Sequence, residues 1–140
     1  MSENKLNIQM VDLKSQYLKI KPQVDLAISE VINSTQFING SHVKEFQTEL
    51  ADYMGVKHVI TCGNGTDALQ IAMMGLGLKP GDEVITPSFT YIATTEVIAL
   101  LGLKPVFVDC DPKTFNISAN EIEKAITNKT KAIVPVHLFG

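Results

Sequence analysis

Short apolar runs alternate with helix-forming segments over the second half of this chain, and this alternation constrains the fold more than any other feature. Each run is rich in valine and isoleucine, and the segments between the runs have apolar residues at helical spacing. The predicted strands are residues 58–62, 83–86, 105–109 and 131–136, and the predicted helices are 66–76, 91–101 and 119–127. Continuous apolar strands separated by helices indicate an α/β protein with a parallel sheet covered on both faces.

The residues before this alternation form a helical segment. One stretch of helical periodicity is expected to begin at Pro22, which suits a first helical turn, and a second follows Ser41 and ends at Gly55. We therefore expect an N-terminal helical segment, residues 1–57. It would be followed by a single incomplete domain, residues 58–140, made of the first strand–helix repeats.

A glycine-rich turn joins the first predicted strand to the helix that follows it. The turn is Cys62-Gly63-Asn64-Gly65-Thr66. Glycines let backbone N–H groups approach an anion closely, and the start of a helix offers unpaired N–H donors and the positive end of its dipole. Thr66 adds a hydroxyl. The turn is a candidate phosphate site, although a well-capped strand-to-helix turn without a ligand has the same pattern.

Polar and aromatic side chains gather in the loops that follow the predicted strands. Ligands of open parallel sheets bind beyond the carboxyl ends of the strands, so these loops share one edge. Besides the glycine-rich turn, they contain Ser88, Phe89, Thr90, Tyr91, Asp109 and His137. A planar cofactor that carries a phosphate would fit this set. Asp109 is equally suited to capping a turn and His137 to packing, so neither is assigned a catalytic role.

The turn also matches a dinucleotide fingerprint. Gly63, Gly65 and Ala68 fit G-x-G-x-x-A directly after a predicted strand. That fingerprint requires an acidic residue at the carboxyl end of the second strand. Asp82 and Glu83 have nearly the right spacing, but they lie at the start of that strand. A Rossmann-type dinucleotide site is therefore the second hypothesis.

The composition argues against several other classes of protein. The net charge is −3, with twelve basic residues that are all lysine, so a basic surface for nucleic acid is not expected. No apolar run is long enough to span a membrane, and the polar first residues do not resemble a signal peptide, so we expect a cytoplasmic protein. Cys62 and Cys110 lack the spacing of a metal site, and no metal is expected.

Long ordered motifs resemble one family over nearly the whole chain. The motifs are residues 64–69, 80–94, 105–109 and 136–140. They resemble the DegT/DnrJ/EryC1/StrS family, whose members are pyridoxal-phosphate (PLP) sugar aminotransferases of the aspartate-aminotransferase fold. The resemblance implies the type I fold, a three-layer and mostly parallel sheet that is incomplete in this chain. It also implies pyridoxal 5′-phosphate as cofactor and a homodimer.

The same resemblance implies a cofactor site, position by position. Gly65, Thr66 and Asp67 match the family's phosphate-binding turn, and Tyr91 matches the aromatic residue that stacks on the pyridine ring. Asn64 stands where other members commonly have serine. The resemblance thus implies that Asn64, Gly65, Thr66, Asp67 and Tyr91 bind the cofactor.

The implied activity is transfer of an amino group, with glutamate as expected donor, to the keto group of a nucleotide-linked sugar in surface-polysaccharide biosynthesis. PLP chemistry needs a Schiff-base lysine and a carboxylate that faces the pyridine nitrogen. In the family both follow the segment that resembles residues 136–140, and none of the twelve lysines here matches. We therefore expect a fragment that contains no catalytic residue and is inactive by itself.

Three alternatives to the aminotransferase remain. A PLP-dependent sugar dehydratase of the same family would have histidine in place of the lysine. A Rossmann-type domain would bind NAD, and a non-catalytic interaction module would bind neither cofactor.

Overall fold

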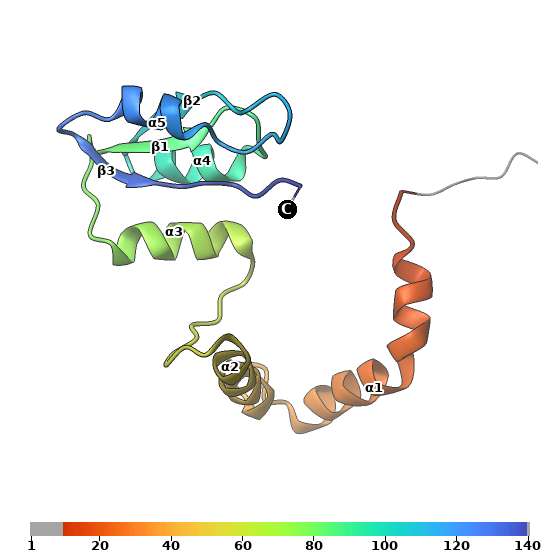
Figure 1. Ribbon diagram of the computed structural model, residues 1–140. Coiled ribbons are helices and arrows are strands. Elements are labelled where there is room, and N and C mark those ends of the chain that lie inside the picture. The colour runs from red at the N-terminus through yellow and green to blue at the C-terminus, as the bar shows by residue number, and fades with distance from the viewer. Residues whose placement is uncertain (1–9, 140) are drawn as a thin grey trace, which may run out of the picture. The chain divides into compact units, whose positions relative to one another are not determined.

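The structure is a computed structural model that describes residues 10–139 (Figure 1). The elements in chain order are α1 (Leu13–Ser34), α2 (Ser41–Met54), α3 (Gly65–Gly75), β1 (Glu83–Pro87), α4 (Ala93–Leu100), β2 (Lys104–Val108), α5 (Ala119–Ala125) and β3 (Thr130–Ile133). The chain divides into two compact units, one that ends at Thr61 and one that begins at Cys62. The first unit contains α1 and α2, and the second contains the sheet.

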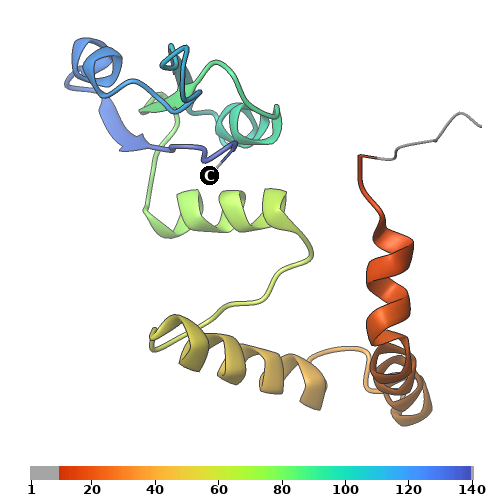
Figure 2. The ribbon, with the colours of Figure 1, turned by 45° about the vertical axis from the view of Figure 1, so that its right-hand side comes forward.

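The sheet has the order β2-β1-β3, and both pairings are parallel. Val84 of β1 lies opposite Pro105 of β2 and Ala132 of β3. In both ribbon views α5 and α3 lie on opposite sides of the sheet (Figures 1 and 2). The predicted α/β architecture with a parallel sheet between helical layers is confirmed.

The core of the second unit lies between the sheet and two helices. Its buried residues come from α3, β1, α4 and the turn before β2, and they are Met73, Val84, Val97, Ile98 and Leu103. The ribbon shows α3 running antiparallel to β1 (Figure 1). The N-terminus of α3 therefore lies toward the carboxyl ends of the strands, which is the edge where parallel sheets bind ligands.

The predicted strand at residues 58–62 is not formed. His58 and Ile60 are exposed and Val59 is half-buried, and no strand of the described residues pairs with this run. Its β-branched residues favour extended backbone, but a strand also requires a hydrogen-bonded neighbour. The prediction was therefore wrong at this run, and the described sheet begins with β1.

The first helix begins earlier than predicted. It starts at Leu13, because the Asp12 carboxylate accepts a hydrogen bond from the backbone N–H of Ser15 at 2.9 Å. Pro22 lies inside α1 instead of in its first turn, and Figure 1 shows that α1 is bent. Tyr17 and Lys21 both contact the carboxylate of Asp25, so these side chains connect the turns on either side of the proline.

Thr86 carries a buried hydroxyl without a hydrogen-bond partner among the described residues. Its side chain is fully buried in β1, where an unpaired hydroxyl is unfavourable. Thr86→Val keeps the shape and removes that group, so we expect the free energy of unfolding to rise by about 1 kcal/mol. Urea denaturation followed by circular dichroism measures this change.

Thr130→Val is the control for Thr86→Val. The Thr130 hydroxyl accepts a hydrogen bond from the Thr127 N–H at 2.9 Å, so its loss should lower the free energy of unfolding. A less stable Thr86→Val protein would contradict the prediction.

Candidate functional site

The glycine-rich turn forms the start of α3, as its sequence predicts. Asn64 is the N-cap, and its side-chain Oδ1 accepts a hydrogen bond from the backbone N–H of Asp67 at 2.9 Å. The Asn64 carbonyl accepts from the N–H of Ala68 at 3.1 Å. The first N–H groups of a helix have no partner within the helix, so those of Gly65 and Thr66 remain available. Together with the helix dipole they make this turn suitable for an anion.

The space around the turn also fits a phosphate. Gly65 is exposed, and a Cβ built on it would meet nothing within 4 Å. Thr66 is half-buried beside it in the first turn of α3. An oxyanion could therefore approach both backbone N–H groups and the Thr66 hydroxyl, and these are the donors that phosphate requires.

The structure places Tyr91 in the loop between β1 and α4, with its ring largely exposed (76%). This loop begins at Ser88, whose N–H donates to the Val108 carbonyl at 2.9 Å and extends the β1–β2 pairing. Tyr91 is therefore held at the carboxyl edge of the sheet, and its exposed ring could stack on a planar ligand.

Asp109 and His137 also lie beyond the strands, as predicted. The Asp109 carboxylate accepts a hydrogen bond from the N–H of Cys110 at 2.9 Å, and His137 is exposed. Asp109 thus takes part in the turn after β2. Among residues 10–139, no hydrogen bond links the side chain of Asp109 or His137 to the glycine-rich turn or to Tyr91.

Three phenylalanines from three different loops meet at this edge. The ring centroids of Phe89 and Phe115 are 5.4 Å apart, and those of Phe115 and Phe139 are 5.5 Å apart. Phe89 and the loop of His137, which also contains Phe139, were predicted to lie at this edge, whereas Phe115 was not. Its position depends on a left-handed backbone (φ 59°). A turn at Asp111 precedes Phe115, and an aspartate at this place is the sequence feature that could have indicated it. The Asp111 carboxylate accepts hydrogen bonds from the N–H groups of Lys113 and Thr114, and these bonds lower the pKa of Asp111.

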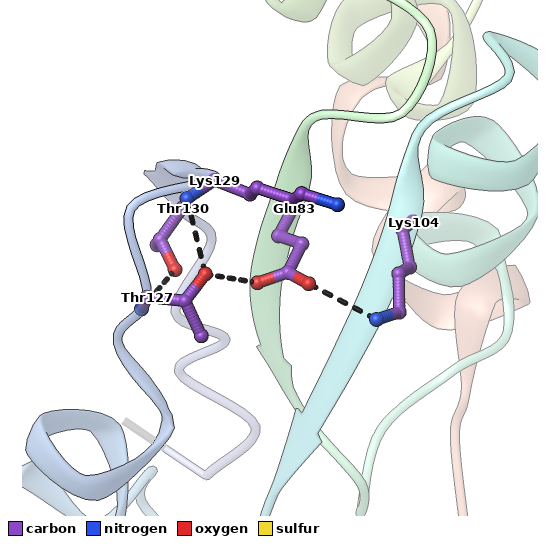
Figure 3. Close-up of polar contacts among 5 residues, drawn as sticks. All are labelled: Glu83, Lys104, Thr127, Lys129 and Thr130. Carbon is purple, nitrogen blue, oxygen red and sulfur yellow. Dashed lines mark hydrogen bonds and ion pairs between the residues drawn. The ribbon is translucent and has the colours of Figure 1, made fainter.

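The two acidic residues considered for a dinucleotide site have other partners. Glu83 is buried at the start of β1, and its carboxylate accepts hydrogen bonds from the Thr127 hydroxyl at 2.6 Å and from Lys104 Nζ at 3.0 Å (Figure 3). The Asp82 carboxylate accepts from the Lys79 N–H at 2.8 Å. Both groups lie at the amino end of the sheet. A ribose at the carboxyl edge could therefore not use either carboxylate.

Among residues 10–139 no group of three or more histidine, cysteine, aspartate or glutamate side chains could hold a metal ion. None of the helices described is long and apolar enough to cross a membrane.

Known proteins match this chain over nearly its whole length. Residues 18–140 match the DegT/DnrJ/EryC1/StrS aminotransferase family. The chain is 54% identical over 133 residues to the UDP-2-acetamido-2-deoxy-3-oxo-D-glucuronate aminotransferase of Pseudomonas aeruginosa, covering 95% of this chain and 37% of that protein.

Solved structures agree with this match. A DegT DnrJ EryC1 StrS aminotransferase from Brucella abortus superposes with a TM-score of 0.90 at 45% identity, over 96% of this chain and 38% of that one. NtdA from Bacillus subtilis, solved with bound cofactor PMP (pyridoxamine phosphate), superposes with a TM-score of 0.86 at 35% identity, over 99% of this chain and 33% of that one. This chain therefore spans about a third of the length of these relatives. It belongs to the DegT/DnrJ/EryC1/StrS aminotransferase family.

Proposed function

We propose that this chain forms the phosphate-binding turn and the ring-stacking side of a PLP-dependent aminotransferase that acts on the keto group of a nucleotide-linked sugar. The observation that carries this proposal is the open N-terminus of α3, with the N–H groups of Gly65 and Thr66 free for an anion. The Pseudomonas aeruginosa relative is named for amino transfer to a UDP-linked 3-oxo sugar acid, which supports the same substrate class here.

The proposed roles follow from where the residues lie. Gly65 and Thr66 would donate backbone N–H groups to the cofactor phosphate, and the Thr66 hydroxyl would add a third donor. Tyr91 would stack on the pyridine ring. Asn64 and Asp67 would complete the turn. When bound, PLP carries an amino group from a donor amino acid to the keto sugar.

The remaining parts of the proposal concern the whole enzyme. Glutamate is the proposed amine donor, and the proposed product enters surface-polysaccharide biosynthesis. The proposed assembly is a cytoplasmic homodimer. The lysine that holds the cofactor matches no residue of this chain, so the 140-residue chain by itself is proposed to bind the cofactor weakly and to have no transaminase activity.

Binding of pyridoxal 5′-phosphate to the purified chain tests this proposal. We expect the cofactor to shift the amide resonances of Gly65 and Thr66 and to raise the melting temperature, whereas NAD should do neither. Thr66→Ala should weaken this binding by about tenfold, because a charge-assisted hydrogen bond is lost.

Thr48→Ala is the matched control, because the Thr48 hydroxyl donates to the Lys44 carbonyl in α2 and is not part of the turn. Its affinity for pyridoxal 5′-phosphate should equal that of the unmodified chain. A response to NAD without one to pyridoxal 5′-phosphate would favour the dinucleotide alternative, and a response to neither would favour an interaction module.

A further inference from the structure

The side chains of Asn64 and Asp67 form a reciprocal pair at the start of α3. Asn64 Oδ1 accepts from the backbone N–H of Asp67 at 2.9 Å, and Asn64 Nδ2 donates to the Asp67 carboxylate at 3.1 Å. Gly63 lies against the same carboxylate, since a Cβ built on it would be 2.9 Å from Asp67 Oδ2. The Asp67 carboxylate therefore contacts Asn64 and occupies the space that a side chain at position 63 would need.

This pair gives the Asn64 amide a single favourable orientation. A carboxylate only accepts hydrogen bonds, and a backbone N–H only donates them. The amide can satisfy both groups only with Nδ2 toward the Asp67 carboxylate and Oδ1 toward the N–H. Without the carboxylate, the amide would keep only its bond to the backbone N–H of residue 67, so the Asn64 side chain would lose one of its two restraints.

We infer that Asp67 is a positioning residue that acts through Asn64, and that it does not itself contact the cofactor phosphate. This inference rests on the proposed function, and it changes the role of one residue expected to bind the cofactor. With Asn64 fixed, the N–H of Asp67 is occupied and those of Gly65 and Thr66 are left for the phosphate. Gly63 leaves room for this arrangement, because a Cβ there would lie 2.9 Å from Asp67 Oδ2 and the carboxylate would have to shift.

Amide hydrogen exchange in the 140-residue chain tests the pair without any ligand. In the unmodified chain and in Asp67→Asn, which keeps an acceptor oxygen for Asn64, the amide of residue 67 should exchange slowly. In Asp67→Ala and Gly63→Ala it should exchange about fivefold faster, because the cap is worth about 1 kcal/mol. Equal exchange in Asp67→Asn and Asp67→Ala would overturn the inference, whether or not the chain binds pyridoxal 5′-phosphate.

Titration with pyridoxal 5′-phosphate, and separately with pyridoxal, tests the link to the phosphate. We expect Asp67→Ala to weaken binding of the phosphorylated form about fivefold relative to pyridoxal, and Asp67→Asn to restore it. Tighter binding in both variants would overturn the inference, because it would show that the carboxylate faces and repels the phosphate. Glu96→Gln, which removes the first-turn charge of α4, is the control and should bind like the unmodified chain.

The two arms separate the inference from the proposed function. If the unmodified chain binds no pyridoxal 5′-phosphate but the exchange pattern holds, then the proposed function fails and the positioning of Asn64 by Asp67 stands. If the chain binds the cofactor and the exchange rates of the two Asp67 variants are equal, then the positioning fails and the proposed function stands.

Discussion

Gly40→Ala is expected to lower the free energy of unfolding of the first unit by about 1–3 kcal/mol, because the added methyl group has no space. Gly40 is buried at the N-cap of α2. A Cβ at this position would lie 2.5 Å from the backbone carbonyl oxygen of Gln36 and 3.2 Å from the Gln36 Cβ. The oxygen belongs to the backbone of the α1–α2 connection, so it cannot move aside as a flexible side chain would.

The effect of Gly40→Ala is steric and not conformational. Gly40 has φ −65° and ψ 177°, which alanine adopts without strain. Amide exchange of α2, measured with and without the substitution, gives the change in stability of this unit.

Two other glycines are matched controls for Gly40. Gly75→Ala, at the end of α3 with nothing within 4 Å of its Cβ, should stabilise by about 0.5 kcal/mol. Gly55→Ala, at the α2 C-cap with φ 65° and free space, should destabilise through backbone strain by about 1 kcal/mol. If Gly40→Ala were as stable as the unmodified chain, the α1–α2 connection could not be packed as described.

Local signals predicted most of the helix boundaries. The helix predicted to begin at residue 119 does so, with the Ser118 hydroxyl accepting from the Glu121 N–H, and α2 ends at Gly55 as predicted. At Pro22 the local preference for a first turn was overridden, because Asp12 caps the helix ten residues earlier. Caps and turns depend on neighbours in sequence, so a pattern of residues contains most of the necessary information.

Long-range features were less accessible from the sequence. The strand at residues 58–62 was predicted from β-branched residues, but pairing requires a partner that local sequence does not specify. The order β2-β1-β3 likewise depends on contacts between distant segments. In the candidate site, the glycine-rich turn was recognisable because its residues are contiguous. The contact of Phe115 with Phe89 and Phe139 was not, because it joins three loops.

Glu83→Ala is expected to lower the melting temperature by about 5–10 °C at neutral pH, because Glu83 connects the amino ends of all three strands. Its carboxylate accepts from Lys104 of β2 and from Thr127, and its backbone N–H donates to the Lys129 carbonyl at 2.9 Å (Figure 3). Thr127 in turn is fixed by Thr130 at the start of β3. Removal of the buried carboxylate takes the acceptor from the Thr127 hydroxyl and the partner from Lys104, and it leaves unfilled space at the start of β1.

The contribution of Glu83 should depend on pH in a defined direction. The hydrogen bonds from Thr127 and Lys104 favour the charged carboxylate, so the pKa of Glu83 lies below its ordinary value of 4.5. Below that value the unfolded chain binds a proton that the folded chain does not. The stabilisation is therefore complete above pH 4.5 and is lost as the pH falls through the lowered pKa of the folded state.

Glu83→Gln separates the charge from the hydrogen bonds. The amide keeps an acceptor for the Thr127 hydroxyl but does not titrate, so this variant should be less destabilised than Glu83→Ala. Its melting temperature should also change less than that of the unmodified chain between neutral pH and pH below 4.5. Melting curves recorded across this range for the three proteins measure both effects.

The matched control for Glu83 is Glu121→Gln, which removes a carboxylate paired with Lys124 on the surface of α5. A solvent-exposed pair contributes little, so its melting temperature should change by no more than about 2 °C. If Glu83→Gln and Glu121→Gln had the same small effect at every pH, Glu83 would be no more than a surface charge. The parallel strands would then be joined at their amino ends by backbone hydrogen bonds and apolar packing alone. A larger, pH-dependent effect at Glu83 would instead show that this buried carboxylate stabilises the sheet from the end opposite the proposed cofactor site.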